Sequence, residues 1–203
     1  MKNPPDARTS EHATASTTPE SDRPMNQDDL TSQLAELHPA CWAWALVCCK
    51  RDPHEAEDVL QDAYIKLMTG RARFEGRSSF KTFLFSVVRT TAYERRRKRM
   101  KRSLLLGEWF GPSERAAASS TPAPQPHLVD GSRQRALVLD ALSTLSDRQR
   151  EILELVFYHD LSIEEAASVL DMKLGTARTH YARGKKRMLE ILDANPRFDW
   201  EPT

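Results

Sequence analysis

Several protein classes are excluded by what this sequence of 203 residues lacks. No apolar run approaches the length of about 20 residues that a transmembrane helix needs. Three cysteines, Cys41, Cys48 and Cys49, are too few for a disulfide framework, so a reducing, cytoplasmic setting is expected. Only seven glycines are present, and apolar and polar residues hardly ever alternate as they do in strands. An extended β-sheet is therefore not expected, and helices are expected to build the core.

Motifs for catalysis and cofactor binding are also missing. The sequence holds no P-loop, no H-E-x-x-H and no G-x-S-x-G pattern. The spacing of His38 and the three cysteines matches no standard zinc pattern, and Cys41 and Cys48 fall on an apolar stripe, where cysteine acts as a small hydrophobe. We therefore expect no enzyme activity, no catalytic residue, no cofactor, no metal and no small-molecule substrate.

Charge of one sign does not dominate, but the two signs are segregated. The chain has 30 Lys and Arg residues against 29 Asp and Glu residues. Residues 89–102 contain eight basic residues and a single acid, Glu94, whereas residues 52–62 contain five acids and no Lys or Arg. Segregation of this kind predicts separate surfaces for separate partners.

Helical periodicity predicts an all-α protein of two small domains joined by a flexible linker. The opening Ser/Thr/Pro-rich residues lack the apolar stretch of a secretory signal and are expected to be a disordered leader, with Met25 as an alternative start. The predicted divisions are a leader at 1–29, a first domain at 30–102, a linker at 103–132, a second domain at 133–193 and a tail at 194–203. No direct insertion into a membrane is expected.

Three amphipathic helices are predicted in the first domain. Apolar residues recur every three or four positions over residues 30–48, where Pro39 is expected to break the helix or begin a new turn. Asp52 and Pro53 are typical of an N-cap and the first helical position, and Gly70 is well placed to end that helix. A third helix is expected to run into the arginine-rich segment.

The second domain is punctuated by two capping boxes, one from Ser146 to Gln149 and one from Ser162 to Glu165. The second box opens a short helix, and a tight turn then leads to a final helix at about 175–192. These proportions are typical of a helix-turn-helix, whose second helix enters the major groove of DNA.

The final helix is expected to bind DNA because it is basic and has no acid from Lys173 to Met188. Residues near its start would meet base edges, and residues further along would meet phosphates. The candidate DNA-binding residues are Thr176, Arg178, Thr179, Arg183, Lys185 and Lys186. Apolar Ala177, Tyr181 and Met188 are expected to face the rest of the domain.

Separate segments of the chain resemble one known family. Residues 55–67 (EAEDVLQDAYIKL) are similar to the polymerase-binding helix of bacterial sigma factors of the extracytoplasmic-function type, in the sigma-70 family. Residues 74–84 (FEGRSSFKTFL) resemble their promoter-opening segment, and residues 145–189 resemble their C-terminal domain. The matches occur in the family's order across a linker, which makes the resemblance specific.

The resemblance implies a sigma factor that binds core RNA polymerase and directs promoter-specific initiation of transcription. The implied polymerase-binding residues are Glu55, Asp58, Gln61 and Asp62, whose acids recur on one helix face. The implied residues for melting and reading the minus-ten element are Phe74, Arg77, Phe83, Thr90, Arg95, Arg96 and Arg97. The final helix would read the minus-thirty-five element. Phe83 departs from the family's usual tryptophan, and Thr90 stands where an asparagine is common.

Two other interpretations are open at this stage. A stand-alone helix-turn-helix regulator would use residues 133–192 to bind DNA without polymerase. An RNA-binding adaptor would use the arginine run, although no stacking platform for bases is visible. The expected partners are core RNA polymerase and promoter DNA, and the resemblance alone adds an anti-sigma factor.

Overall fold

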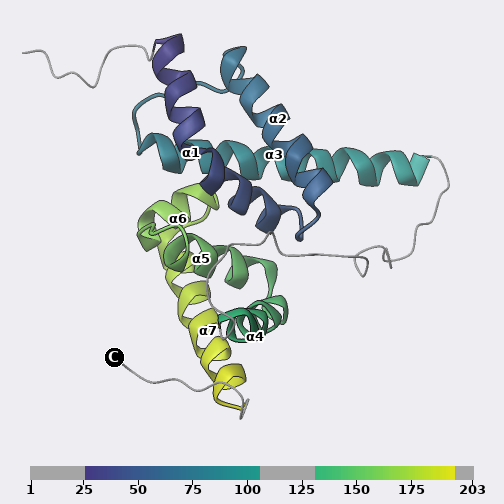
Figure 1. The fold of residues 1–203 in the computed structure, drawn as a ribbon, viewed down its shortest axis with the longest axis vertical. Helices are drawn as coiled ribbons and strands as arrows, with labels where there is room; N and C mark the ends of the chain where they lie inside the picture. Colours follow the sequence, from purple (N-terminus) through teal and green to yellow (C-terminus); the bar gives the residue numbers. More distant parts are fainter. Residues whose placement is uncertain (1–25, 106–130, 195–203) are drawn as a thin grey trace, which may run out of the picture.

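The computed structural model describes residues 26–105 and 131–194, which form seven helices and no strand (Figure 1). The N-terminal domain consists of α1 (Gln27–Cys48), α2 (Pro53–Met68) and α3 (Phe80–Leu105). The C-terminal domain consists of α4 (Gly131–Ser143), α5 (Asp147–Phe157), α6 (Ile163–Val169) and α7 (Leu174–Asp193). The expected all-α fold is confirmed for these ranges. Most of the predicted leader, linker and tail lies outside the described residues.

Pro39 does not break α1, so the predicted interruption there was wrong. One helix continues from Gln27 through the exposed Pro39 to Cys48. Leu34 precedes the proline and Trp44 follows it, and both are buried in the same core. Packing on both sides of Pro39 offsets the loss of one helical hydrogen bond, a tertiary effect that local sequence rules do not capture.

The boundaries of α2 follow the sequence signals. The Asp52 carboxylate accepts hydrogen bonds from the backbone N–H groups of His54 and Glu55, both at 3.1 Å, and Pro53 occupies the first turn. Beyond the C-cap, Gly70 adopts a φ of +68°, a left-handed conformation that favours glycine. The predicted N-cap and stop are therefore confirmed.

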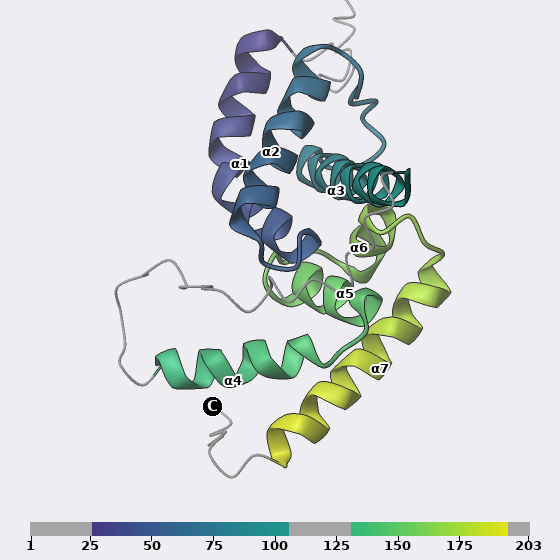
Figure 2. The ribbon, with the colours of Figure 1, turned by 90° about the vertical axis from the view of Figure 1, so that its right-hand side faces the viewer.

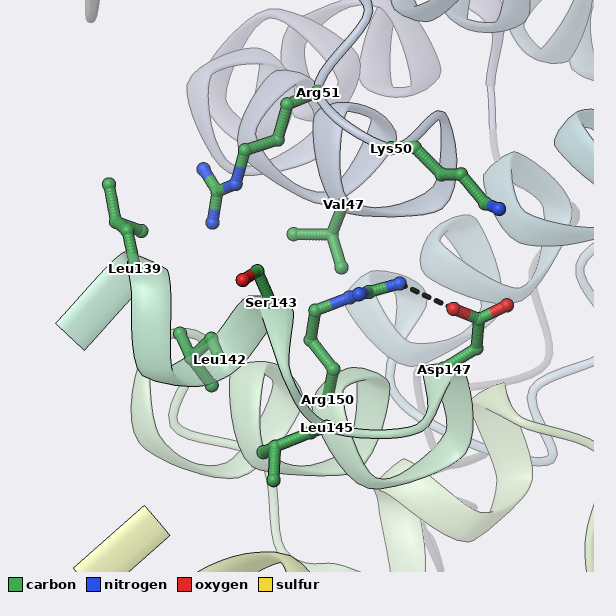
Figure 3. A pocket seen from close by; sticks show the side chains of 9 residues that line it. All are labelled: Val47, Lys50, Arg51, Leu139, Leu142, Ser143, Leu145, Asp147 and Arg150. Atoms are coloured by element: carbon green, nitrogen blue, oxygen red, sulfur yellow. Dashed lines mark hydrogen bonds and ion pairs between the residues drawn. The ribbon is translucent and has the colours of Figure 1, made fainter. Parts of the chain in front are cut away.

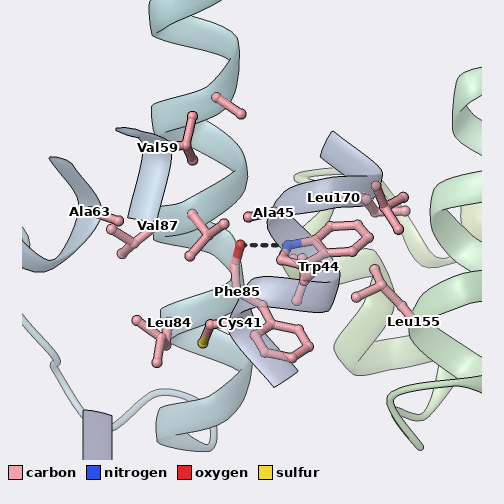
Figure 4. Close-up of a cluster of buried hydrophobic side chains, with 14 of the residues drawn as sticks. Cys41, Trp44, Ala45, Val59, Ala63, Leu84, Phe85, Val87, Leu155 and Leu170 are labelled. Atoms are coloured by element: carbon pink, nitrogen blue, oxygen red, sulfur yellow. Dashed lines mark hydrogen bonds between the residues drawn. The ribbon is translucent and has the colours of Figure 1, made fainter. Parts of the chain in front are cut away.

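The apolar core continues from one domain into the other. Trp44 is fully buried, and its indole Nε1 donates a hydrogen bond of 3.0 Å to the backbone carbonyl of Phe85 in α3. Leu155 and Leu170 of the C-terminal domain lie on the other side of the indole (Figure 4). The two domains thus share buried surface.

At this junction α3 contacts α6, and α1 contacts α5 (Figure 2). On the other side of the C-terminal domain, α4 and α7 pack together. The arginine-rich half of α3 projects past the other helices of its domain and ends at Leu105, beyond the position where the linker was expected to begin (Figure 1). None of the described helices is long and apolar enough to cross a membrane.

Candidate functional site

The acidic face of α2 (Glu55, Asp58 and Asp62) lies opposite the buried side of that helix. Burial of Ala56, Val59, Leu60, Ala63 and Leu67 turns these acids outward. The exposed fractions of the Asp58 and Asp62 side chains are 55% and 44%, and that of Glu55 is 19%. Gln61 is exposed beside them.

This acidic face is covered by arginines of α3. Arg95 Nη2 lies 2.5 Å from Asp58 Oδ2, its Nη1 lies 2.6 Å from Asp62 Oδ2, and its Nε lies 3.5 Å from Glu55 Oε1. Arg99 Nη1 is 2.6 Å from Glu55 Oε2. The hydrogen bond to Asp62, together with the nearby carboxylates, raises the pKa of the Arg95 guanidinium above its usual value. The structure therefore brings together residues that the sequence assigned to two different surfaces.

The rest of the arginine run divides into two environments. Arg96 and Arg97 are exposed on α3. Arg89, by contrast, is buried, and its Nη2 lies 3.5 Å from Glu151 Oε2 in α5. The run is thus one basic segment in the sequence but not one basic surface in the fold.

Three phenylalanines form a half-buried aromatic cluster at the start of α3. The ring centroids of Phe74 and Phe83 are 5.4 Å apart, those of Phe74 and Phe80 5.5 Å, and those of Phe80 and Phe83 6.2 Å. Phe74 lies in the preceding loop, so the cluster joins that loop to the helix. Phe80 belongs to it although it was not a predicted site residue.

The polar residues predicted for the minus-ten site, Arg77 and Thr90, are exposed. Arg77 has an 86% exposed side chain and pairs with Glu75 at 2.8 Å. Thr90 is exposed farther along α3. Glu94, one turn beyond Thr90, pairs with Lys66 of α2 at 2.8 Å.

The C-terminal domain contains the predicted helix-turn-helix. Its first helix, α6, opens with a complete capping box, because Glu165 N donates to Ser162 Oγ at 3.1 Å and Ser162 N donates to Glu165 Oε2 at 2.9 Å. The turn is closed by a 3.0 Å bond from Met172 N to Ala167 O, with Asp171 at a φ of +48°. Short-chain polar residues such as aspartate tolerate that conformation better than most.

All six candidate DNA-binding residues of α7 are exposed. The opposite side of α7 carries the buried residues Ala177 and Gly184. A Cβ atom added at Gly184 would lie 3.2 Å from Gln149 Cβ and 3.2 Å from Leu153 Cδ1, so this glycine permits close packing of α7 on α5. Packing through small residues therefore fixes which side of α7 faces away from the domain.

Polar contacts between the domains were not predicted from the sequence. The buried Glu151 accepts from Arg89 and from the Tyr93 hydroxyl at 3.0 Å across the junction, and from Arg148 of its own helix at 3.3 Å. A usable signal existed, since Arg89 falls four residues after Phe85 on the inward stripe of α3. Nothing in the local sequence of α5 indicates that Glu151 is the partner of Arg89.

His159 fills the apolar part of the same junction. Its ring lies 4.8 Å from that of Phe85 and 6.1 Å from that of Trp44, and its backbone carbonyl accepts a 2.5 Å hydrogen bond from Lys81 Nζ. Burial, aided by the positive charge of Lys81, lowers the pKa of His159 to about 4. The imidazole is therefore neutral at physiological pH.

A cavity of about 300 Å³ opens between the end of α1 and the α4–α5 corner (Figure 3). Its apolar wall includes Val47, Leu142 and Leu145, and its cations are Lys50, Arg51 and Arg150. Arg150 pairs with Asp147 at 2.7 Å.

Cys41 is buried, and Cys48 and Cys49 are partly buried. Within residues 26–105 and 131–194, no cluster of three or more His, Cys, Asp or Glu side chains could hold a metal ion. Burial raises the pKa of Cys41 and of Cys49 to about 12, which disfavours the reactive thiolate.

Comparisons with known proteins match both domains. The family model of sigma-70 region 2 matches residues 34–102, and that of sigma-70 region 4 matches residues 135–188. The ECF RNA polymerase sigma factor SigX of Bacillus subtilis is 31% identical over 137 residues, 67% of this chain and 70% of that protein. The chain belongs to the sigma-70 family. Region 2 corresponds to α1–α3, and region 4 corresponds to α4–α7.

Other ECF sigma factors and solved structures agree. SigC of Mycobacterium tuberculosis is 28% identical over 160 residues, 75% of this chain and 77% of that protein. The sigma factor RpoE of Bartonella quintana, solved with the anti-sigma factor NepR, is 27% identical with a TM-score of 0.66, covering 83% of this chain and 99% of that one. CnrH, solved with the cytosolic domain of CnrY, shares the fold at 20% identity and a TM-score of 0.54, covering 84% and 91%.

This sigma factor therefore binds core RNA polymerase and directs it to promoter DNA. The stand-alone regulator is not favoured. It would bind DNA through the C-terminal domain alone, whereas the N-terminal domain of this chain matches sigma-70 region 2.

Proposed function

We propose that the two regions divide the work as the resemblance implied. In this proposal α2 binds core polymerase, the loop before α3 together with α3 melts and reads the minus-ten element, and α7 reads the minus-thirty-five element. The observation that carries it is the exposed, acid-free start of α7, which follows a capped α6, on the same chain as a region 2 match at residues 34–102.

The polymerase-binding role of Glu55, Asp58, Gln61 and Asp62 is supported by their place on the exposed side of α2. Carboxylates at a partly exposed surface favour a basic partner through long-range attraction. Such an interface has a salt-sensitive association rate.

The minus-ten role is supported by the aromatic cluster and the exposed arginines. Capture of an unstacked base requires an aromatic or apolar wall, which Phe74 and Phe83 supply. Exposed Arg96 and Arg97 suit phosphate contacts, which add affinity but no sequence information. Arg77, Thr90 and Arg95 complete the proposed set, and Arg95 requires a rearrangement before it can contact DNA.

The minus-thirty-five role is supported by the arrangement of α7. Arg178, Thr179 and Arg183 are exposed near the start of the helix, where a recognition helix contacts base edges. The Thr179 hydroxyl donates to Gly175 O at 2.9 Å and keeps its acceptor lone pairs for a base. Arginine presents paired donors to guanine O6 and N7.

We also propose a cytoplasmic protein without catalytic activity of its own. An anti-sigma factor is a proposed further partner, because the structures of RpoE and CnrH are complexes with NepR and with CnrY.

The test is promoter binding by the reconstituted holoenzyme on a library randomised across the upstream element. Arg178→Ala or Arg183→Ala is expected to cost about 1–3 kcal/mol and to relax selectivity at one base position. Lys185→Ala or Lys186→Ala is the matched control and is expected to weaken all sequences alike and lower the salt dependence.

If both arginine variants weaken every sequence equally, these residues contact phosphates and the placement of α7 in the groove is wrong. If the protein binds one promoter sequence equally tightly without core polymerase, the division of labour between the regions is wrong as well.

A further inference from the structure

Residues assigned to DNA and residues assigned to polymerase neutralise each other in the free chain. All three guanidinium nitrogens of Arg95 are occupied, by Asp58, Asp62 and Glu55 at 2.5, 2.6 and 3.5 Å. Arg99 adds a second contact to Glu55 at 2.6 Å. Two arginines thus face three carboxylates, which leaves this acid–arginine cluster with one excess negative charge.

We propose that Arg95 couples the two binding surfaces of region 2. In the free protein it covers the α2 carboxylates, and it passes to promoter phosphates when basic side chains of polymerase take those carboxylates over. The inference rests on the proposed function, in which the acidic face of α2 binds polymerase.

The two states of Arg95 exclude each other. A phosphate that approaches the free protein at Arg95 meets a guanidinium whose nitrogens already face carboxylates and a cluster whose net charge repels it. Once polymerase supplies cations to Asp58 and Asp62, the same guanidinium is released with its full charge. Polymerase binding therefore strengthens DNA binding, and by linkage DNA strengthens polymerase binding equally.

Replacing the ion-pair partners of these carboxylates costs little free energy because the acid–arginine cluster is partly exposed. The side chains of Arg95, Asp58 and Asp62 are 29%, 55% and 44% exposed. Ion pairs at such positions contribute little to folding stability, so one set of cations can replace another without unfolding the helices. A buried pair such as Arg89–Glu151 does not allow this exchange.

Arg97 provides the matched control. It lies two residues from Arg95 on α3, is exposed, and is not among the arginines paired with the α2 acids in the described residues. Both residues belong to the proposed phosphate-binding set, but only Arg95 is occupied before polymerase arrives.

The experiment measures three affinities of the full-length protein: for core polymerase, for promoter DNA as holoenzyme, and for duplex DNA alone. Arg95→Gln is expected to tighten binding to core polymerase about two- to fivefold, because the carboxylates are uncovered. Arg97→Gln is expected to leave that affinity unchanged. Both variants should weaken holoenzyme binding to DNA and lower its salt slope by about one. Without polymerase, only Arg97→Gln should weaken DNA binding.

The coupling is overturned if Arg95→Gln weakens core polymerase binding or leaves it unchanged. Asp58→Asn combined with Asp62→Asn separates this failure from failure of the proposed function. If that double variant binds core polymerase normally, the acidic face is not the polymerase site. If it binds poorly while Arg95→Gln brings no gain, only the coupling is wrong. Thermal melting verifies folding. Arg99→Gln removes the shorter of the two arginine contacts to Glu55 and should give a smaller gain, and it replaces Arg95→Gln if that variant does not fold.

Discussion

At the scale of single residues, His159 is a neutral imidazole enclosed by the aromatic rings of Trp44 and Phe85. Its folded-state pKa of about 4 lies below the ordinary value of 6.5. As the pH falls from 6.5 towards 4, the unfolded chain takes up a proton there and the folded chain does not. The free energy of unfolding is therefore expected to fall by about 3 kcal/mol over that window.

Urea denaturation between pH 4 and 7.5 measures this effect, with His159→Gln as the comparison. The variant should show a shallower dependence of stability on pH. Burial raises the pKa of Glu151 and of Glu154, which stabilises the folded state as the pH falls, but these groups are present in both proteins and cancel in the difference. Equal pH slopes in the two proteins would contradict the assignment to His159.

For single residues, the sequence predicted which side chains are exposed better than it predicted which side chains they contact. The α7 candidates were expected to point outward, and they are exposed. Arg89 and Arg95 belong to one basic run, yet one is buried against Glu151 and the other lies on the acids of α2. The distinction depends on partners 62 and 33 residues away in the sequence, which periodicity within one helix cannot reveal.

At the scale of elements, helix boundaries could be predicted because their signals are local. The N-cap of α2 and the capping box of α6 each place donor and acceptor within three residues. Pro39 was predicted wrongly for the opposite reason, since packing of α1 on α2 and α3 decides whether the helix continues. Local rules apply at helix ends and lose force in a helix interior that is held by tertiary contacts.

The capping box of α6 gives a prediction at this scale. Ser162→Ala removes the acceptor for Glu165 N and is expected to lower the free energy of unfolding by about 1 kcal/mol. Ser162→Gly is expected to cost only a few tenths of a kcal/mol, because glycine lets water and the backbone satisfy the same group. Urea denaturation of both variants measures the two losses, and an unchanged free energy of unfolding for Ser162→Ala would show that the serine side chain does not stabilise the helix as a cap.

At the scale of the whole molecule, the closed arrangement of the domains cannot read both promoter elements at once. Because α6 contacts both α3 and α7, the start of α7 lies within about two helix-packing distances of α3, roughly 20 Å. Elements at minus ten and minus thirty-five are separated by about 25 base pairs, roughly 85 Å of duplex at the B-DNA rise. Reading both therefore requires the domains to separate.

The buried ion pair at the junction predicts how separation can be favoured. Glu151→Gln leaves the buried Arg89 without its counter-ion, and separation of the domains returns that charge to water. We expect a larger radius of gyration for this variant by small-angle X-ray scattering. Arg187→Gln, which breaks the exposed pair with Glu190 within α7, should leave the radius unchanged. A variant that melts earlier at an unchanged radius would show that the junction holds without this pair.

The burial of Trp44 against the other domain also makes it an optical reporter. Its indole is fully buried, with Leu155, Leu170 and His159 beside it from the C-terminal domain. Separation hydrates the indole and shifts its fluorescence emission to longer wavelength. Since the chain has four tryptophans, a version retaining Trp44 alone isolates that signal. The emission wavelength of Trp44 then reports separation of the domains in the free protein in real time, without an attached dye.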